Sequence, residues 1–110
     1  MLVFPREIRY YQKANGKIPY REWFSCLRNG TTQSIINTRL DRVSLGNFGD
    51  HKSVGKSIFE LRFAIESGIR IYFGLDGKKI VILLCGGNKA SQSKDIKIAL
   101  EFWTDYKKRS

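Results

Sequence analysis

The chain has 110 residues, of which 42% are apolar and only two are prolines. A chain of this length buries roughly two-thirds of its unfolded surface and can form a core without metal or disulfide cross-links. The composition excludes a disordered segment and a multidomain protein, so we expect one globular domain over residues 1–110.

The net charge is +10 and is spread along the chain. Lysine and arginine outnumber aspartate and glutamate by nine to four in residues 1–55 and by eleven to six in residues 56–110, so each half carries +5. Because the excess is not confined to a tail, the folded body itself carries the positive field, which favours a polyanionic partner such as nucleic acid. An acidic protein partner, or a merely soluble basic domain, is also compatible with this charge.

The two cysteines, Cys26 and Cys85, form no CxxC pair and no cluster with histidine. We expect both to be buried free thiols in a reducing cytosol, with no bound metal. The N-terminal residues M-L-V-F-P-R-E carry charges where a signal peptide has its apolar core, and no apolar run approaches the roughly 18 residues of a membrane span. We therefore predict a cytoplasmic protein without a membrane segment.

The first part of the chain predicts a strand followed by a helix. Residues 3–11 have strand composition, and Pro5 suggests the start of a strand or an edge position. A turn at residues 15–16 leads to Pro19, which is a favourable first residue of a helix. Apolar residues then recur at i, i+3, i+4 and i+7, and Asn29-Gly30 is expected to close this helix.

A second helix and a loop are predicted next. Thr31 or Thr32 can cap the helix, and Gly46 supplies its stop. Residues 46–56 contain three glycines and no periodicity, so we expect a loop that is long for a small domain.

Three strands are expected in the second half, at residues 58–65, 69–73 and 80–85. Short turns join them, and Asp76-Gly77 is a strong hairpin signal. The third strand is apolar at every position, which predicts a central strand covered on both faces over part of its length. Together they predict an antiparallel meander.

Alternation along these strands places charged residues on one face of the sheet. Glu60 and Arg62 point to the same side of their strand, and Arg70 and Tyr72 point to the same side of the next. The apolar residues between them point to the other side. We therefore expect a cationic sheet face opposite the face on which the helices pack.

A last helix is expected to be capped in the serine-rich step at residues 91–93 and to fray into the basic residues 107–109. The predicted order of elements is β-α-α-β-β-β-α. This order predicts an α+β fold in which a curved antiparallel sheet is packed on one side by helices.

Four motifs stand in register on this predicted topology. They are E-L-R at 60–62, G-I-R-I-Y-F-G at 68–74, L-L-C-G-G-N-K at 83–89 and S-Q-S-K-D-I-K-I-A at 91–99. With the order of elements, they resemble the RelE/ParE superfamily of bacterial type II toxins, and most closely its phage-derived, HigB-like "addiction module killer" branch. The resemblance covers the chain from about residue 4 to residue 107.

The resemblance implies a toxin held inactive by a cognate antitoxin, which in this branch is usually a helix-turn-helix DNA-binding protein. RelE-like and HigB-like members are mRNA endoribonucleases that commonly cut mRNA in the ribosomal A site, without a metal or a small-molecule cofactor. ParE-like members share the fold and poison DNA gyrase instead, so the fold does not choose between these activities. A non-catalytic basic RNA-binding module is a further alternative.

RNA cleavage by the ribose 2′-hydroxyl needs cations at the phosphate, a base for the hydroxyl and an acid for the leaving oxygen. Arg62 and Arg70 could clamp the phosphate, with Lys89 reaching the same group after a Gly-Gly step. Ordinary solvated positions on an exposed sheet face are the alternative for the two arginines.

Three residues are candidates for the general base and the general acid. His51 is the single histidine, and its ordinary pKa suits acid–base work, although a lone loop histidine is more often simply solvated. Glu60 and Tyr72 share the arginine face, and Glu60 could instead orient Arg62 through an ion pair. The remaining cations expected to grip the RNA or ribosomal backbone are Lys52, Lys56 and Lys94.

Overall fold

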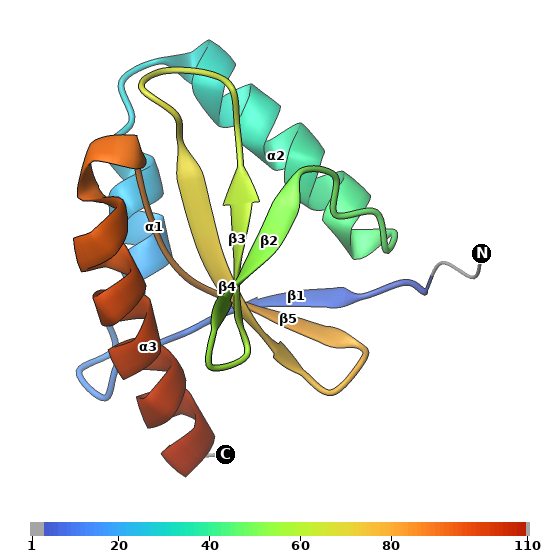
Figure 1. Ribbon diagram of the computed structural model, residues 1–110, viewed down its shortest axis with the longest axis vertical. Coiled ribbons are helices and arrows are strands. Elements are labelled where there is room, and N and C mark those ends of the chain that lie inside the picture. The colour runs from blue at the N-terminus through green and yellow to red at the C-terminus, as the bar shows by residue number, and fades with distance from the viewer. Residues whose placement is uncertain (1–3, 110) are drawn as a thin grey trace.

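The computed structural model describes residues 4–109 (Figure 1). Its elements follow the chain as β1 (Glu7–Tyr10), α1 (Pro19–Ser25), α2 (Gly30–Ser44), β2 (His51–Gly55), β3 (Ile58–Arg62), β4 (Arg70–Asp76), β5 (Ile80–Gly87), a short 3-10 turn (Lys89–Ser91) and α3 (Gln92–Arg109). The fold is therefore α+β, as predicted. Within the described range, none of the helices is both long and apolar enough to cross a bilayer.

The strands form one mixed sheet in the order β1-β5-β4-β3-β2. The predicted antiparallel meander of β3, β4 and β5 is confirmed, and β5 has a neighbour on each side. The sheet is not wholly antiparallel, because β1 pairs with β5 in parallel. β1 lies at an edge, as Pro5 suggested, but it begins only at Glu7, and the predicted start at residue 3 lies outside the described residues.

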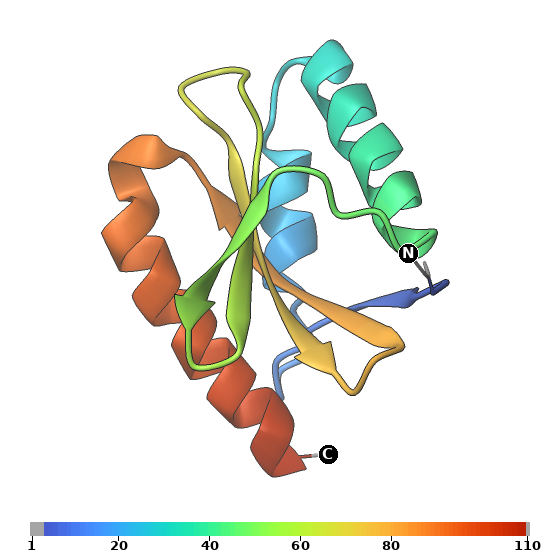
Figure 2. The same ribbon diagram turned by 45° about the vertical axis from the view of Figure 1, so that its right-hand side comes forward.

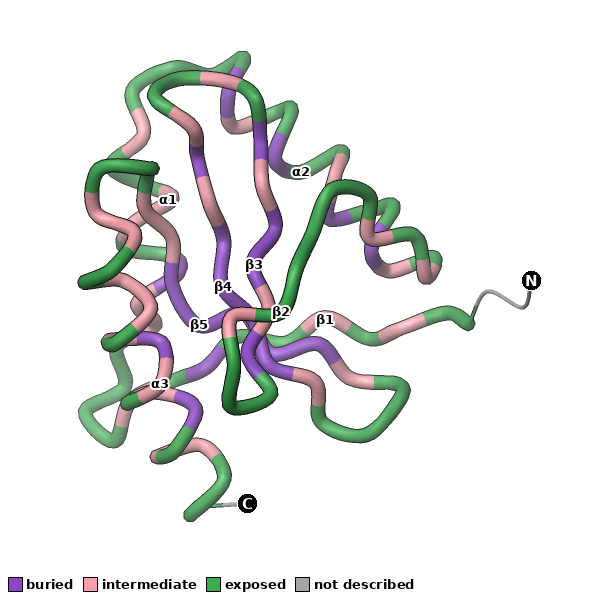
Figure 3. Tube along the Cα trace, viewed as in Figure 1, coloured by how far each residue is buried: buried purple, intermediate pink, exposed green. Residues whose placement is uncertain are grey.

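The predicted loop at residues 46–56 is wrong for its second half. His51–Gly55 form β2, an edge strand that pairs with β3 in antiparallel fashion. The sequence analysis missed this strand because β2 is exposed along almost its whole length (Figure 3). An exposed edge strand does not need the alternation of apolar and polar residues by which strands are recognised. The observed order is β-α-α-β-β-β-β-α, one strand more than predicted.

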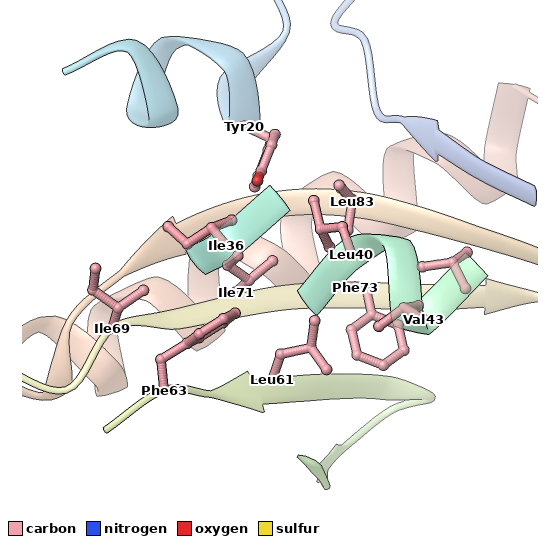
Figure 4. Close-up of a cluster of buried hydrophobic side chains, with 11 residues drawn as sticks. Tyr20, Ile36, Leu40, Val43, Leu61, Phe63, Ile69, Ile71, Phe73 and Leu83 are labelled. Atoms are coloured by element: carbon pink, nitrogen blue, oxygen red, sulfur yellow. The ribbon is translucent and has the colours of Figure 1, made fainter. Parts of the chain in front are cut away.

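The prediction that helices pack on one side of the sheet is also wrong, because both faces are covered. Figure 2 shows α1 and α2 on one side of the strands and α3 on the other. On the first side, residues of α1 and α2 pack on the apolar residues of β3, β4 and β5 (Figure 4). This cluster contains Tyr20, Ile36, Leu40, Val43, Leu61, Phe63, Ile69, Ile71, Phe73, Val81 and Leu83.

The second side contains the residues that were expected to line an open cationic face. Here α3 contributes Ala99 and Trp103, which pack on strand residues that include Ile58, Tyr72 and Ile82. The apolar stripe of α3 has to be buried somewhere, and this face carries enough apolar area to bury it. A helix therefore covers much of the face on which Arg70 lies.

The cap of α2 differs from the one expected, and the 3-10 turn before α3 has a cap of its own. The Asn29 side chain accepts hydrogen bonds from the backbone N–H groups of Thr31 and Thr32, at 2.9 and 3.4 Å, so it caps α2 and does not close α1. Asn88 forms a capping box with Ser91 at the turn before α3. Neither threonine is the cap of α2, because the amide side chain of Asn29, just before the helix, already accepts from their free N–H groups. The last helix continues to Arg109 without fraying at residues 107–109.

The cysteines divide between surface and interior. Cys85 is buried as predicted, whereas Cys26 is exposed just after α1, so the prediction for Cys26 is wrong. Burial, together with the nearby Asp95 carboxylate, raises the pKa of the Cys85 thiol to about 12.

We expect one fast-reacting thiol in the native protein. At pH 8, Cys26 should react with DTNB at the rate of an ordinary exposed thiol. Cys85 should react at least about 100-fold more slowly, because little of it is in the thiolate form and its side chain is buried. A stopped-flow absorbance trace measures both rates. Cys26→Ser should remove the fast phase, and two fast thiols in folded protein would contradict this assignment.

The contact between α3 and the sheet can be tested at Gly74. A Cβ there would lie 2.5 Å from the ring of Trp103, so Gly74→Ala should lower the free energy of unfolding by about 2 kcal/mol. Gly30→Ala is the matched control, since its Cβ would meet nothing within 4 Å. Urea denaturation compares the two, and equal midpoints would contradict the close packing of Trp103.

Candidate nucleic-acid interface

Arg62 and Arg70 lie directly opposite each other on β3 and β4, as their shared face predicted. Arg70 in turn lies opposite Gly87 on β5. These three positions form a row across one end of the sheet, on the face that α3 covers. The absence of a side chain at Gly87 matters, because a Cβ there would lie 1.8 Å from the carboxylate of Asp95 in α3.

The next row along the same face is formed by Lys52, Glu60, Tyr72 and Cys85, each opposite the next. Lys52, on the edge strand β2, is exposed, while Glu60 and Tyr72 are fully buried. Burial and the neighbouring Glu60 carboxylate raise the pKa of the Tyr72 hydroxyl. That hydroxyl lies beside Glu60 without a hydrogen bond of normal geometry.

The Glu60 carboxylate joins the sheet to α3. One of its oxygens lies 3.5 Å from Nη1 of Arg70, and the other accepts a hydrogen bond of 2.8 Å from Nε2 of Gln92. The Arg70 side chain is only 13% exposed, and its Nε atom is buried without a partner among the described residues. Arg70 therefore serves first as the counter-ion of a buried carboxylate.

Arg62 is the accessible member of the pair. Its side chain is 37% exposed and forms an ion pair of 2.9 Å with Asp50, which is more exposed still. Asp50 and Arg62 are held in place by Arg39 of α2, whose guanidinium donates to the backbone oxygens of Phe48, Asp50 and Arg62. Burial lowers the pKa of Arg39. A surface ion pair of this kind exchanges readily for another anion, so Arg62 can bind a phosphate.

Other predicted cations divide between the two ends of the sheet. Lys89 follows β5 and is exposed, and its N–H donates to the oxygen of Ser67 at 3.2 Å, so it lies at the same end as Arg62. Lys94 is exposed on the first turn of α3. Lys56 lies in the turn before β3, whereas Arg62 ends that strand, so the structure does not bring Lys56 to the arginines.

The three acid–base candidates do not meet Arg62 at the surface. His51 lies opposite Leu61, so its side chain points to the face covered by α2. Its ring contacts Phe48, and Nδ1 lies 2.9 Å from the oxygen of Gly49. Glu60 and Tyr72 are sealed under α3 and cannot touch RNA in this structure. The option that Glu60 orients Arg62 is replaced by its pairing with Arg70.

Sequence reasoning missed Gln92, Asp50 and Arg39. Gln92 is an ordinary first residue of a helix, and Asp50 and Arg39 lie in or next to segments without a motif. Only the pairing of distant strands and the docking of α3 bring them to the arginines. Among residues 4–109 there is also no group of three or more His, Cys, Asp or Glu residues that could hold a metal ion.

Comparison with known proteins finds a relative that is uncharacterised in function. The chain matches no family model. It is 46% identical over 82 residues to a protein of Haemophilus influenzae described as "Uncharacterized protein", and the match covers 74% of this chain and 83% of that protein.

The two arginines should differ sharply when each is removed. Arg70→Ala leaves the buried Glu60 carboxylate without its counter-ion and should lower the free energy of unfolding by about 3 kcal/mol or more. Arg62→Ala breaks an exposed pair and should cost less than about 1 kcal/mol.

Urea denaturation at neutral pH measures both effects. The double variant Glu60→Met with Arg70→Met should recover most of the loss, because it removes both buried charges together. Similar losses for Arg62→Ala and Arg70→Ala would contradict the difference in burial on which this prediction depends.

Proposed function

The chain belongs to the family of this Haemophilus influenzae protein, and we propose that it is a HigB-like type II toxin of the RelE/ParE superfamily that cuts mRNA on the ribosome. The observation that carries the proposal is the row of Arg62 and Arg70 at one end of the sheet, with Lys89 at the same end. The meander and the three helices are also compatible with the expected superfamily pattern, to which β2 adds an edge strand.

The proposed reaction is metal-independent. The ribose 2′-oxygen attacks the adjacent phosphorus and its proton passes to water. The bond from phosphorus to the 5′-oxygen breaks, and that oxygen takes a proton from water, so the products are a 2′,3′-cyclic phosphate and a 5′-hydroxyl. Charge develops on the phosphoryl oxygens during this step, and Arg62 and Lys89 would neutralise it from the protein surface. Arg70, whose charge is balanced by Glu60, would not contact the phosphate and would contribute only as the cross-strand neighbour of Arg62.

The proposal includes partners and a location. The substrate would be mRNA, presented by the ribosome in the cytoplasm, and the exposed Lys52 and Lys94 would contact its backbone. A cognate helix-turn-helix antitoxin would hold the toxin inactive. The net charge of +10 suits both the RNA and an acidic region of an antitoxin.

A ParE-like inhibitor of DNA gyrase is the second candidate. The specific observation in its favour is that Glu60 and Tyr72 are buried and that His51 points to the other face of the sheet. A nuclease that uses these residues would need them beside the arginines, whereas an inhibitor needs no base at all. Expression of such an inhibitor would give DNA breaks and filamentation with intact mRNA.

We expect Arg62→Ala to abolish growth arrest. Loss of one donor at the developing phosphate charge should lower mRNA cleavage by about 100-fold or more, while the fold is retained. Primer extension of mRNA ends after brief induction measures cleavage, and growth curves measure arrest. Lys97→Ala, an exposed change elsewhere on α3, is the control and should leave both unchanged.

Three other outcomes would overturn the proposed site or the proposed activity. Undiminished cleavage by a folded Arg62→Ala variant would show that Arg62 has no part in the reaction. Arrest with DNA breaks and intact mRNA would select the gyrase inhibitor. Absence of arrest, cleavage and DNA breaks with the wild-type chain would leave a non-catalytic RNA-binding module.

A further inference from the structure

The outer face of α2 contains a hollow of about 410 Å³. Its walls are small hydroxyl side chains of α2 together with Ile35, Arg39 and Arg42, and Phe63 closes it from the end of β3. The residues that α2 contributes recur on the side of the helix turned away from the core. The hollow therefore lies on the opposite face of the sheet from the side chains of Arg62 and Arg70.

Ile35 is an unusual residue for a solvated helix face. It is 41% exposed, while its neighbour Ile36 is fully buried in the core beneath α2. The flanking threonines and serine are short, so a second backbone can approach α2 closely at this place. Phe63 adds an aromatic floor, and the Arg39 guanidinium lies 4.8 Å above the centre of its ring.

The charge of the hollow selects the class of partner. Two arginines and no acidic residue line it. The N–H groups of Arg39 donate to backbone oxygens, which do not neutralise its positive charge. Arg42 is exposed to solvent. A second copy of this chain would bring another net charge of +10, which opposes association. RNA is also a poor fit, because the exposed Ile35 gives its phosphate backbone neither a charge nor a hydrogen-bond donor.

We propose that this hollow docks an acidic amphipathic helix of a partner protein. An aliphatic side chain of the partner helix covers Ile35 and Phe63. The carboxylates of the partner helix face the guanidinium groups of Arg42 and Arg39 at the edge of the hollow. The surface is independent of the proposed nuclease activity. Arg39 nevertheless links the two places, since it contacts the hollow and also holds the backbone oxygens of Asp50 and Arg62.

A titration of the full chain with a synthetic peptide tests the proposal. The peptide is an amphipathic helix with leucines on one face and glutamates on the other. In ¹⁵N-resolved NMR spectra, the shifts should concentrate at residues 31–42 and at Phe63. Ile35→Asp and Arg42→Glu should each raise the dissociation constant about tenfold.

Matched controls separate the hollow from general charge attraction. Leu45→Asp introduces the same change at an exposed apolar residue just after α2, and Lys97→Glu introduces the same reversal on α3. Both should stay within about twofold of the wild-type affinity. A peptide with lysines in place of the glutamates should bind at least about tenfold more weakly.

Four results would overturn the proposal. They are the absence of shifts at about 1 mM acidic peptide, shifts that centre outside the hollow, equal losses in the hollow and control variants, and equal binding of the lysine peptide. A single-stranded RNA oligonucleotide is titrated in parallel, and its occupation of the same hollow in preference to the acidic peptide would also overturn it. Two independent variants keep the test decisive if one of them fails to fold.

Discussion

The buried carboxylate of Glu60 is the group on which the rest of this structure depends. A carboxylate removed from water is costly unless it is paired and hydrogen-bonded, and Glu60 obtains its partners from two different elements, Arg70 of β4 and Gln92 of α3. The ion pair aligns two strands, and the amide brings the start of α3 down on them. Further along α3, Trp103 closes over Gly74 and completes the same layer. The hydrogen bond of Gln92 and the packing of Trp103 together fix where the last helix lies.

This arrangement gives the two arginines different tasks although they are cross-strand neighbours. Arg70 is largely enclosed because α3 covers it, and its charge balances that of Glu60. Arg62 lies one strand closer to the edge of the sheet and is more exposed, and its partner Asp50 is exposed as well. A phosphate that approaches this end of the sheet therefore meets Arg62 first. Arg70 therefore serves the stability of the fold, and Arg62 is the arginine that remains accessible.

Arg39 connects this end of the sheet with the opposite layer. Its guanidinium holds three backbone oxygens around the entry to β2 and the end of β3, and its flat face lies over Phe63. Such a fork of fixed donors suits arginine and not lysine. The segment that carries Asp50 owes its position to a helix on the far side of the sheet. Any partner that docks on α2 next to Arg39 therefore lies one side chain away from the backbone of Arg62.

The sequence was enough to predict which residues share a strand face and where the meander turns, because these depend on local periodicity and turn chemistry. It could not reveal β2, whose exposed polar residues form a strand only because β3 offers an unpaired edge. Nor could it show that α3 covers the face of Arg70. That outcome depends on contacts between residues far apart in the chain, such as Gln92 with Glu60 and Trp103 with Gly74. Alternation placed the two arginines side by side, and only tertiary packing decided which of them meets solvent.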